Sequence, residues 1–327
     1  MIHGGWMSQA LCSAVQLGLP DRLAAGGQSV AALAASLHCN PDALRRLLRG
    51  LTSLGIVAEQ GHDGYTLAPL GHRLRCDTPD SLGAQALWFG RYSWPLWGEL
   101  VDSVRTGLTR RERRLGQQGY AHLDSDPEAA RVFNLAMVQL TRMVAAAVAS
   151  SLDFTAVRRF VDVGGGYGEL LVACLAANPH ASGTLLEIAH ALPGGQRHLD
   201  DAGLAARAVA QEGDFFVAIP DGADVYLLKA VLHNWDDAQC GVILANVRRA
   251  MAPHARVVVV ERVLPDSIAV SAAHQAVVRS DLKMLVGLGG RERTRGEFAA
   301  LLGAAGFSEP SFRPVAAGFC AIETFGS

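Results

Sequence analysis

Lysine is almost missing from this 327-residue chain. Of its 29 basic residues only Lys229 and Lys283 are lysines, and arginine fills the other positions. The 31 acidic residues balance the basic ones, so the sequence lacks the positive excess that nucleic acids and anionic membranes attract. This balance argues against either of them as the main partner, and it makes the two lysines candidates for specific roles.

Paired cysteines and long apolar runs are missing as well. The six cysteines contain no C-x-x-C pair, which indicates small buried side chains in a reducing compartment, and no metal site is expected. No signal peptide is evident, and no apolar run approaches the length of a membrane span. We therefore expect a cytoplasmic protein without a membrane partner, and the chain length suggests two domains.

Residues 1–98 have the pattern of a helical domain that ends in a small hairpin. Helices are expected over 8–17, 30–37 and 42–54, and two short strands around a glycine turn follow over 56–67. This order predicts a winged helix-turn-helix.

Winged helices often bind DNA, but the composition of this domain argues against that function. It holds seven arginines and six acidic residues, whereas a protein that reads the major groove normally has a basic excess on one helix. We expect the domain to pack against a second copy of the chain, forming a homodimer. A DNA-binding regulator remains the alternative, which a mobility-shift assay would test.

Residues 99–152 are expected to be helices that link the two domains and contribute to a substrate pocket. Asp126-Pro127 is a typical helix start, and apolar residues continue at helical spacing through Met137. Aromatic side chains gather just upstream, around Trp88. Such residues most often form core or interface, and the alternative is that some of them line an apolar pocket.

In residues 153–327, strands and helices alternate. Alternation of this kind predicts an α/β class domain with a doubly wound, mainly parallel sheet that binds ligands at the carboxyl ends of its strands. Strands are expected at 160–163, 183–187, 206–210, 224–229, 256–262, 312–316 and 319–325.

A glycine-rich turn follows the first of these strands. Gly164, Gly165 and Gly166 stand between an apolar run and a helical pattern, where backbone N–H groups can approach an anionic or polar ligand. The dinucleotide pattern G-x-G-x-x-G fails at its third glycine, where Glu169 stands, and no P-loop Gly-Lys-Ser/Thr follows. The turn matches the first loop of a class I S-adenosylmethionine (SAM) methyltransferase, and a turn that uses glycine only for packing is the alternative.

Polar residues follow the next strands at the same edge of the sheet. Glu187 comes 23 residues after Gly164 and can accept hydrogen bonds from both hydroxyls of a ribose. Asp214 offers an acceptor for an adenine amino group, and Phe215 offers a wall for its ring. Lys229 ends the fourth strand.

A histidine stands four residues after Lys229. His233 at a ligand crevice can remove a proton near neutral pH, although a lone histidine is more often a core or capping residue. Here Glu261 stands at the end of the next strand and Glu292 stands in a glycine-flanked segment. Two carboxylates beside one imidazole would fix its tautomer and raise its basicity, so the three residues predict a general base.

Six motifs occur in the order and spacing of one enzyme family. They are Val161–Gly166, Gly213–Phe216, Leu228-Lys229 with His233–Asp237, Glu261–Pro265, Asp281–Leu285 and Glu292–Thr294. In these motifs the chain resembles the SAM-dependent small-molecule O-methyltransferases of the plant caffeic-acid type and their bacterial polyketide and antibiotic relatives. The resemblance covers essentially the whole chain.

The resemblance implies a class I methyltransferase domain behind a winged-helix dimerisation domain, with SAM as cofactor and no metal. Catalytic roles are implied for His233, Glu261 and Glu292. Cofactor binding is implied for Asp162, Gly164, Gly165, Gly166, Glu187, Asp214, Phe215 and Lys229. Contact with the acceptor is implied for Met137 and Met284, and Trp88 and Asn234 are further candidates for that contact.

The chain departs from the family pattern in three places. Glu187 stands where an aspartate followed by Leu-Pro is usual, and the longer side chain would shift the ribose. Asn234 stands where the residue after the base is usually aspartate, which removes any electrostatic help from that position. The chain also begins close to its first helix, which would weaken the dimer or reflect a late start codon.

The sequence therefore predicts methyl transfer to a phenolic or enolic hydroxyl of a small, aromatic secondary metabolite, with His233 as the base. Nitrogen and carbon acceptors stay open. Family members with non-methylating chemistry are a further alternative, but they tend to lose the His–Glu set that this chain keeps.

Overall fold

The computed structural model describes residues 2–116 and 119–326. The chain divides into two compact units, Met1–Trp97 and Gly98–Ser327, and each is described by itself. The helices that follow residue 98 belong to the second unit, together with the large sheet.

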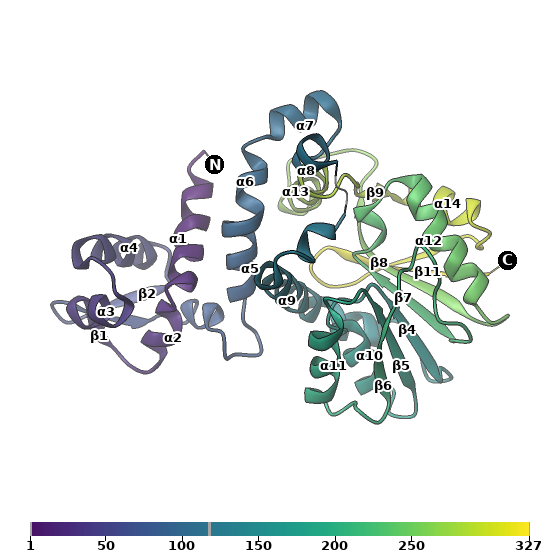
Figure 1. Ribbon diagram of the computed structural model, residues 1–327, viewed down its shortest axis with the longest axis horizontal. Helices are drawn as coiled ribbons and strands as arrows, with labels where there is room; N and C mark the ends of the chain where they lie inside the picture. Colours follow the sequence, from purple (N-terminus) through teal and green to yellow (C-terminus); the bar gives the residue numbers. More distant parts are fainter. Residues whose placement is uncertain (1, 117–118, 327) are drawn as a thin grey trace. The chain divides into compact units, whose positions relative to one another are not determined.

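The N-terminal unit is a winged-helix arrangement of helices around a small sheet (Figure 1). Its helices are α1 (Gly4–Gln16), α2 (Leu19–Ala24), α3 (Val30–Leu37), α4 (Pro41–Ser53), the 3-10 turn η1 (Gly71–Leu74), α5 (Gly83–Leu87), the π-helical segment η2 (Trp88–Ser93) and α6 (Trp94–Trp97). Asn40 caps α4, where its side chain accepts hydrogen bonds from two backbone N–H groups. Leu33, Leu48 and Leu51 are fully buried in the core between the helices.

The sheet of this unit has three strands instead of the expected two. The strands are β1 (Gln28–Ser29), β2 (Val57–Gln60) and β3 (Gly64–Leu67), in the order β1-β3-β2. Residues Gln28 and Ser29 pair with β3 just before Ser29 caps α3. A two-residue strand shows no alternation, so the sequence pattern could not reveal it.

The second unit begins with helices. They are α7 (Leu100–Thr106), α8 (Arg110–Leu115), the 3-10 turn η3 (Ala121–Leu123) and α9 (Pro127–Ser151). The expected helix start is confirmed, because the side chain of Asp126 caps α9. Of the described helices, α9 is the one that is long and apolar enough to cross a membrane, yet half of its most apolar window is buried inside the structure. The core helix of a soluble protein passes the same test.

A large mixed sheet forms the centre of this unit (Figure 1). Its strands are β4 (Arg159–Val163), β5 (Ser182–Glu187), β6 (Ala208–Glu212), β7 (Val225–Lys229), β8 (Arg256–Leu264), β9 (Arg293–Thr294), β10 (Ser311–Pro314) and β11 (Phe319–Phe325). Their order is β10-β11-β8-β7-β4-β5-β6, with β9 paired to β8. The strands from β4 to β9 pair in parallel, and β10 and β11 pair antiparallel, so the expected doubly wound sheet is confirmed.

Helices cover both faces of the sheet. They are α10 (Glu169–Ala177), α11 (Leu192–Asp201), α12 (Asp237–Ala250), α13 (Ala272–Gly287) and α14 (Arg295–Ala304), with the 3-10 turn η4 (Leu232–Asn234) after β7. Val257 and Val259 belong to one buried cluster with α12 and α14, and Val258 and Val260 to another with α9, α10 and α11. The apolar run of β8 is therefore buried on both sides, as a strand between two helical layers must be.

The strand β8 is longer than expected. It continues to Leu264, because β9 pairs with Val263 and Leu264 and β11 pairs as far as Arg262. Its neighbour β7 stops earlier, with Lys229 opposite Val260. Glu261 is therefore inside β8 and not at its end, and it is the first residue of β8 beyond the end of β7.

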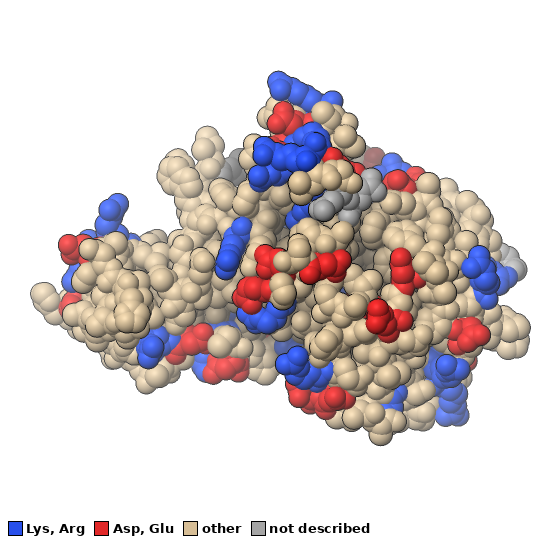
Figure 2. Space-filling view, in the orientation of Figure 1, with Lys and Arg blue, Asp and Glu red and all other residues tan. Residues whose placement is uncertain are grey.

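Charge on the surface is mixed. Figure 2 shows Lys and Arg interspersed with Asp and Glu on the face in view, in agreement with the balanced composition.

Candidate active site

The glycine turn joins β4 to α10 through left-handed backbone. Gly164, Gly166 and Gly168 have φ angles of 65°, 64° and 80°, which residues with a Cβ rarely adopt. A Cβ on Gly164 would also lie 3.1 Å from the ring of Phe215. Glycine is needed here for conformation and for space.

A buried carboxylate lies under this turn. Asp162 is fully buried in β4, and neither of its oxygens has a hydrogen bond of standard geometry among the described residues. Burial, followed by the charge of Glu187, raises the pKa of Asp162 to about 7, and the nearby N–H of Leu171 opposes this only in part. A Cβ on Gly165 would lie 2.3 Å from Oδ2 of Asp162, so Gly165 leaves room for the carboxylate.

Glu187 extends from the end of β5 back to the glycine turn. Its Oε1 accepts a hydrogen bond from the N–H of Gly166 over 2.8 Å, and its Oε2 accepts one from the N–H of Ile188 over 2.9 Å. Burial raises the pKa of this carboxyl. The length of glutamate lets one carboxylate join β5 to the turn.

Asp214 and Phe215 follow β6, as expected. Asp214 is exposed, and its carboxylate accepts a hydrogen bond from the N–H of Phe216. The Phe215 ring packs edge-on against Trp235, with ring centres 6.0 Å apart. The glycine turn therefore faces an aromatic side chain on one side and Asp162 on the other.

Lys229 is buried at the end of β7. Its ammonium lies over the ring of Phe319, 5.1 Å from the ring centre. Burial lowers the pKa of Lys229 to about 8, and the charge of Glu261 opposes that shift.

These features fit the methionine end of SAM. The carboxylate of Asp162 is buried and has no standard hydrogen-bond partner among the described residues, so it is available to pair with a cationic amino group. The turn from Gly164 to Gly166 leaves space that a Cβ would fill. The carboxylate of Glu187 lies beside this turn, at the end of the next strand.

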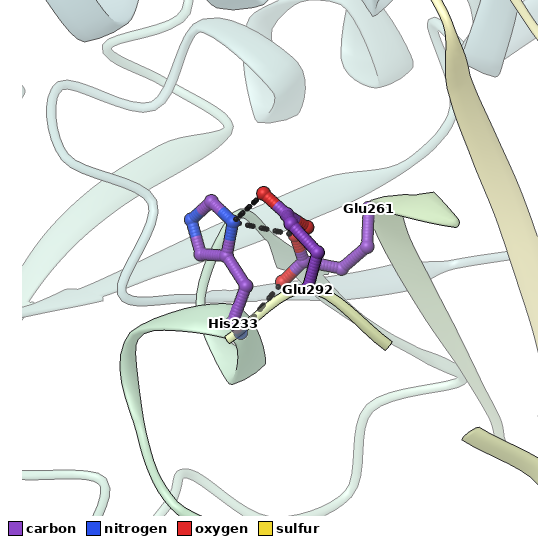
Figure 3. Close-up of side chains that lie close together, drawn as sticks. All are labelled: His233, Glu261 and Glu292. Atoms are coloured by element: carbon purple, nitrogen blue, oxygen red, sulfur yellow. Dashed lines mark hydrogen bonds and ion pairs between the residues drawn. The ribbon is translucent and has the colours of Figure 1, made fainter. Parts of the chain in front are cut away.

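His233, Glu261 and Glu292 come together from three segments (Figure 3). His233 belongs to η4, Glu261 to β8, and Glu292 precedes β9. The Nδ1 atom of His233 lies 3.0 Å from Oε1 of Glu292 and 3.4 Å from Oε2 of Glu261, and the N–H of His233 donates to Oε1 of Glu261 over 3.2 Å. Both carboxylates thus hold the same side of the imidazole.

The three groups shift one another's ionisation. Burial alone would lower the pKa of His233, but the charges of Glu261 and Glu292 outweigh it and raise that pKa. Burial also raises the pKa of Glu261, whereas the charge and hydrogen bond of His233 lower the pKa of Glu292. Lys283, on α13, opposes the rise at His233. An imidazolium is therefore well stabilised here.

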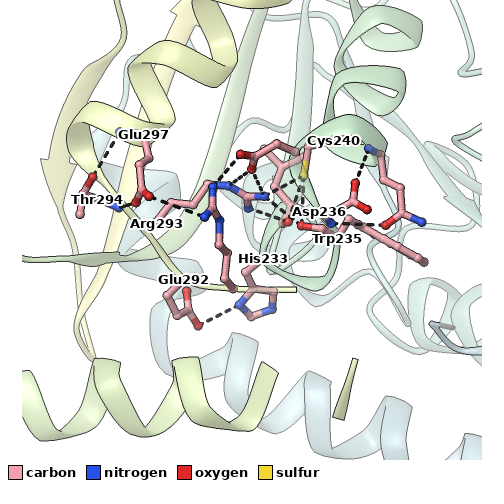
Figure 4. A network of polar contacts seen from close by, with 12 residues as sticks. His233, Trp235, Asp236, Cys240, Glu292, Arg293, Thr294 and Glu297 are labelled. Atoms are coloured by element: carbon pink, nitrogen blue, oxygen red, sulfur yellow. Dashed lines mark hydrogen bonds and ion pairs between the residues drawn. The ribbon is translucent and has the colours of Figure 1, made fainter. Parts of the chain in front are cut away.

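The turn that carries His233 is held by a buried arginine (Figure 4). The guanidinium of Arg293 donates to the carbonyls of Leu232 and Trp235, over 3.0 and 2.9 Å, and pairs with Asp237 at 2.7 Å. The sequence pattern predicts no role for Arg293 beyond its place in a motif. Its position next to Glu292 in the sequence was the one sign of this role, because both residues contact the turn that carries His233.

Two further residues fix Glu292. The hydroxyl of Ser280 donates to Oε1 of Glu292 over 2.6 Å, and the backbone N–H of Glu292 donates to Oδ1 of Asp281 over 2.9 Å. Gly290 permits the approach, because a Cβ there would lie 2.1 Å from the carbonyl oxygen of His233. The approach of Gly290 to His233 joins positions 57 residues apart, and Ser280 and Asp281 reach Glu292 from α13, so no local sequence pattern reveals these contacts.

The residues expected to contact an acceptor lie in both units. Met137 is half-buried in α9, and Met284 is fully buried in α13. Asn234 is buried next to His233. Trp88 belongs to the N-terminal unit, where its ring stacks on that of Tyr92. Their contact with an acceptor stays a prediction.

Two family models match the chain. The O-methyltransferase domain matches residues 97–308, and the O-methyltransferase dimerisation domain matches residues 1–75. The chain is 38% identical over 323 residues to phenazine O-methyltransferase PhzM of Lysobacter antibioticus, covering 99% of this chain and 94% of that one. It is 39% identical over 312 residues to O-demethylpuromycin-O-methyltransferase of Streptomyces alboniger, covering 94% and 82%.

Solved structures agree with this similarity. The crystal structure of LaPhzM superimposes with a TM-score of 0.95 at 37% identity, over 100% of this chain and 97% of that one. Human N-acetylserotonin methyltransferase in complex with SAM superimposes with a TM-score of 0.90 at 27% identity, over 100% and 95%. The resemblance inferred from the motifs is confirmed: the chain belongs to the O-methyltransferase family and is a SAM-dependent methyltransferase of secondary metabolism.

Proposed function

We propose that this enzyme methylates a phenolic or enolic hydroxyl of a small aromatic metabolite, with His233 as general base. The observation that carries the proposal is the placement of two buried carboxylates at Nδ1 of His233. Because Nδ1 faces them, it holds the ring proton in the neutral imidazole, and Nε2 becomes the acceptor. No described residue hydrogen-bonds to Nε2.

The proton then has a defined route. As the acceptor oxygen becomes nucleophilic, its proton moves to Nε2 of His233, and the charges of Glu261 and Glu292 stabilise the imidazolium that forms. A phenol has a pKa near 10, so a base of lower pKa helps mainly while the new bond forms. Positioning contributes more, because the reaction needs a close, aligned approach.

SAM, when bound, supplies an electrophilic methyl group that ends as a methyl ether on the acceptor oxygen, while its sulfur keeps the bonding electron pair. The chain's part is to hold it. Asp162 would pair with its amino group, the turn from Gly164 to Gly166 would hold its methionine end, and Glu187 would accept hydrogen bonds from its ribose. Asp214, Phe215 and Lys229 would complete the site around the adenosine.

The substrates in the names of related enzymes support an aromatic acceptor. They include a phenazine, 3-amino-4-hydroxybenzoate and a dihydroxynaphthoate. One relative, 33% identical, is an N,N-dimethyltransferase of 8-amino-8-demethylriboflavin, and another, 37% identical, is the aclacinomycin hydroxylase RdmB. A nitrogen acceptor is therefore the second candidate, and the base would take its proton in the same way.

Acceptor contacts are part of the proposal. We assign Met137 and Met284, both in the second unit, to an apolar wall of the acceptor site, and for Trp88 an acceptor contact stays the prediction made from the sequence. The match to the dimerisation domain supports a homodimer formed through the N-terminal unit.

His233→Ala tests the proposal. Turnover of phenolic and aminoaromatic acceptors with SAM, followed by mass spectrometry, should fall at least 100-fold, while the affinity for S-adenosylhomocysteine measured by calorimetry stays near wild type. The exposed His180 provides the matched control, and His180→Ala should leave both values unchanged. Full activity in His233→Ala would reject the general base, and transfer confined to nitrogen would reject the hydroxyl acceptor.

A further inference from the structure

The chain adopts a rare backbone conformation just before the base. Ala230, the residue after β7, has a φ angle of 54°, in the left-handed region that a Cβ disfavours. Such residues persist only where their surroundings hold them, and they cluster at functional sites. Ala230 stands three residues before His233, so its conformation sets the direction in which the turn leaves the sheet.

A buried side chain holds this residue. The Nδ2 atom of Asn234 donates to the carbonyl oxygen of Ala230 over 2.9 Å, and Asn234 is only 4% exposed. A carbonyl oxygen can only accept, so the NH2 group must be the part of the amide that faces it. The hydrogen bond closes a loop around the three residues from Val231 to His233.

We propose that Asn234 is a positioning residue: its amide fixes the left-handed turn at Ala230 and so keeps His233 against its two glutamates. The inference rests on the proposed role of His233 as base. An ionised aspartate at position 234 could not do this, because it has no hydrogen to donate to the Ala230 carbonyl.

The rest of the turn is held without Asn234. The N–H of Ala230 donates to the carbonyl of Val260, and the carbonyls of Leu232 and Trp235 accept hydrogen bonds from Arg293. Removal of the Asn234 amide should therefore leave a folded enzyme whose base is less well placed.

An aspartate at this position would also change the charge around the base. His233 is already faced by Glu261 from β8, by Glu292 from the segment before β9 and by Lys283 from α13. A third carboxylate would raise the pKa of His233 further, and a neutral alanine would not. Asn234→Asp and Asn234→Ala therefore separate loss of the hydrogen bond from added charge.

The experiment measures kcat, KM and their pH dependence with SAM and the acceptor that the wild type turns over best. Both variants should lower kcat at least tenfold with less than about threefold change in KM. The acid limb of kcat should move to higher pH in Asn234→Asp alone. Adding Ala230→Gly to Asn234→Ala should restore kcat severalfold, because glycine adopts the left-handed conformation without strain.

Two residues provide matched controls. Asn178 is buried and makes the same kind of hydrogen bond, to the carbonyl four residues earlier, over 2.8 Å at the end of α10. Ala317 has the same φ of 54° and is exposed between β10 and β11. Asn178→Ala and Ala317→Gly should leave kcat and its pH dependence unchanged.

Wild-type kcat in Asn234→Ala, or no rescue by Ala230→Gly, would overturn the inference. Neither result would contradict the proposed function, which is rejected only if His233→Ala stays active or if oxygen is not methylated.

Discussion

The Nδ1 atom of His233 donates to Oε1 of Glu292 over 3.0 Å, inside a site where both side chains are buried. The charges of Glu261 and of this Glu292 carboxylate favour the protonated ring, which is why the pKa of His233 lies above its ordinary value. A general base must be neutral to act. The enzyme should therefore lose activity as the pH falls through a value above about 6.5, the ordinary pKa of histidine.

Glu292→Gln tests this relationship. The amide removes a charge that raises the pKa of His233, so the acid limb of kcat should move to lower pH. The plateau should fall about 10- to 100-fold, because the imidazolium loses part of its stabilisation. The measurement is kcat against pH, with the exposed Glu309→Gln as control. A limb that moved to higher pH would contradict the electrostatic argument.

Asp162→Asn should separate cofactor binding from stability. Asparagine carries no negative charge to pair with the cationic amino group, so the affinity for S-adenosylhomocysteine should fall about 10- to 100-fold. In the wild type, affinity should rise with pH through about 7, where the carboxyl ionises. Calorimetry over this range measures both. An affinity that does not depend on pH in the wild type would count against the pairing.

The same substitution should stabilise the ligand-free protein. The pKa of Asp162 is higher in the folded protein than in the unfolded chain. Its contribution to the free energy of unfolding is therefore fully present below the pKa of the unfolded chain, and it is lost as the pH rises through about 7. Above that pH the buried charge destabilises the fold by roughly 2–4 kcal/mol, and Asn removes it. Urea unfolding should show Asp162→Asn to be more stable than wild type at pH above 7, with a smaller difference in acid.

Gly165→Ala should disrupt the cofactor site by steric clash alone. Its Cβ would lie 2.3 Å from Oδ2 of Asp162, so the turn or the carboxylate must move. We expect at least a tenfold loss of affinity for S-adenosylhomocysteine. Gly241 is the matched control, since a Cβ in that helical position would have nothing within 4 Å. Gly241→Ala should leave binding unchanged and stabilise α12 by about 0.5–1 kcal/mol.

The sequence predicted the sheet because its strands carry strong local signals. The apolar run of β8 and the glycine turn after β4 fix their elements within a few residues. The end of β8 was misjudged, because Val263 and Leu264 are strand residues only through pairing with Arg293 and Thr294. The surroundings of Glu292 could not be predicted from the sequence either. Ser280 donates a hydrogen bond to Glu292 and Gly290 lets its segment approach His233, and both contacts form only in the folded chain.

Arg293 illustrates what a motif leaves out, and it carries the last prediction. Its fully buried guanidinium holds the carbonyls of Leu232 and Trp235 and pairs with Asp237. Arg293→Met would leave both carbonyls without these donors inside the protein. Unfolding should become easier by about 2–4 kcal/mol, and kcat should fall because the turn that carries His233 loosens.

Arg291 offers a control on the same acidic partner. Its guanidinium pairs with Asp237 at 2.6 Å, but both side chains are about half exposed. Exposed pairs contribute little, so Arg291→Met should change stability by less than about 1 kcal/mol and leave kcat unchanged. Urea unfolding and steady-state kinetics on both variants make the comparison. If the two arginine variants behave alike, the ion pair with Asp237 explains the effect, and the carbonyls of the turn do not depend on Arg293.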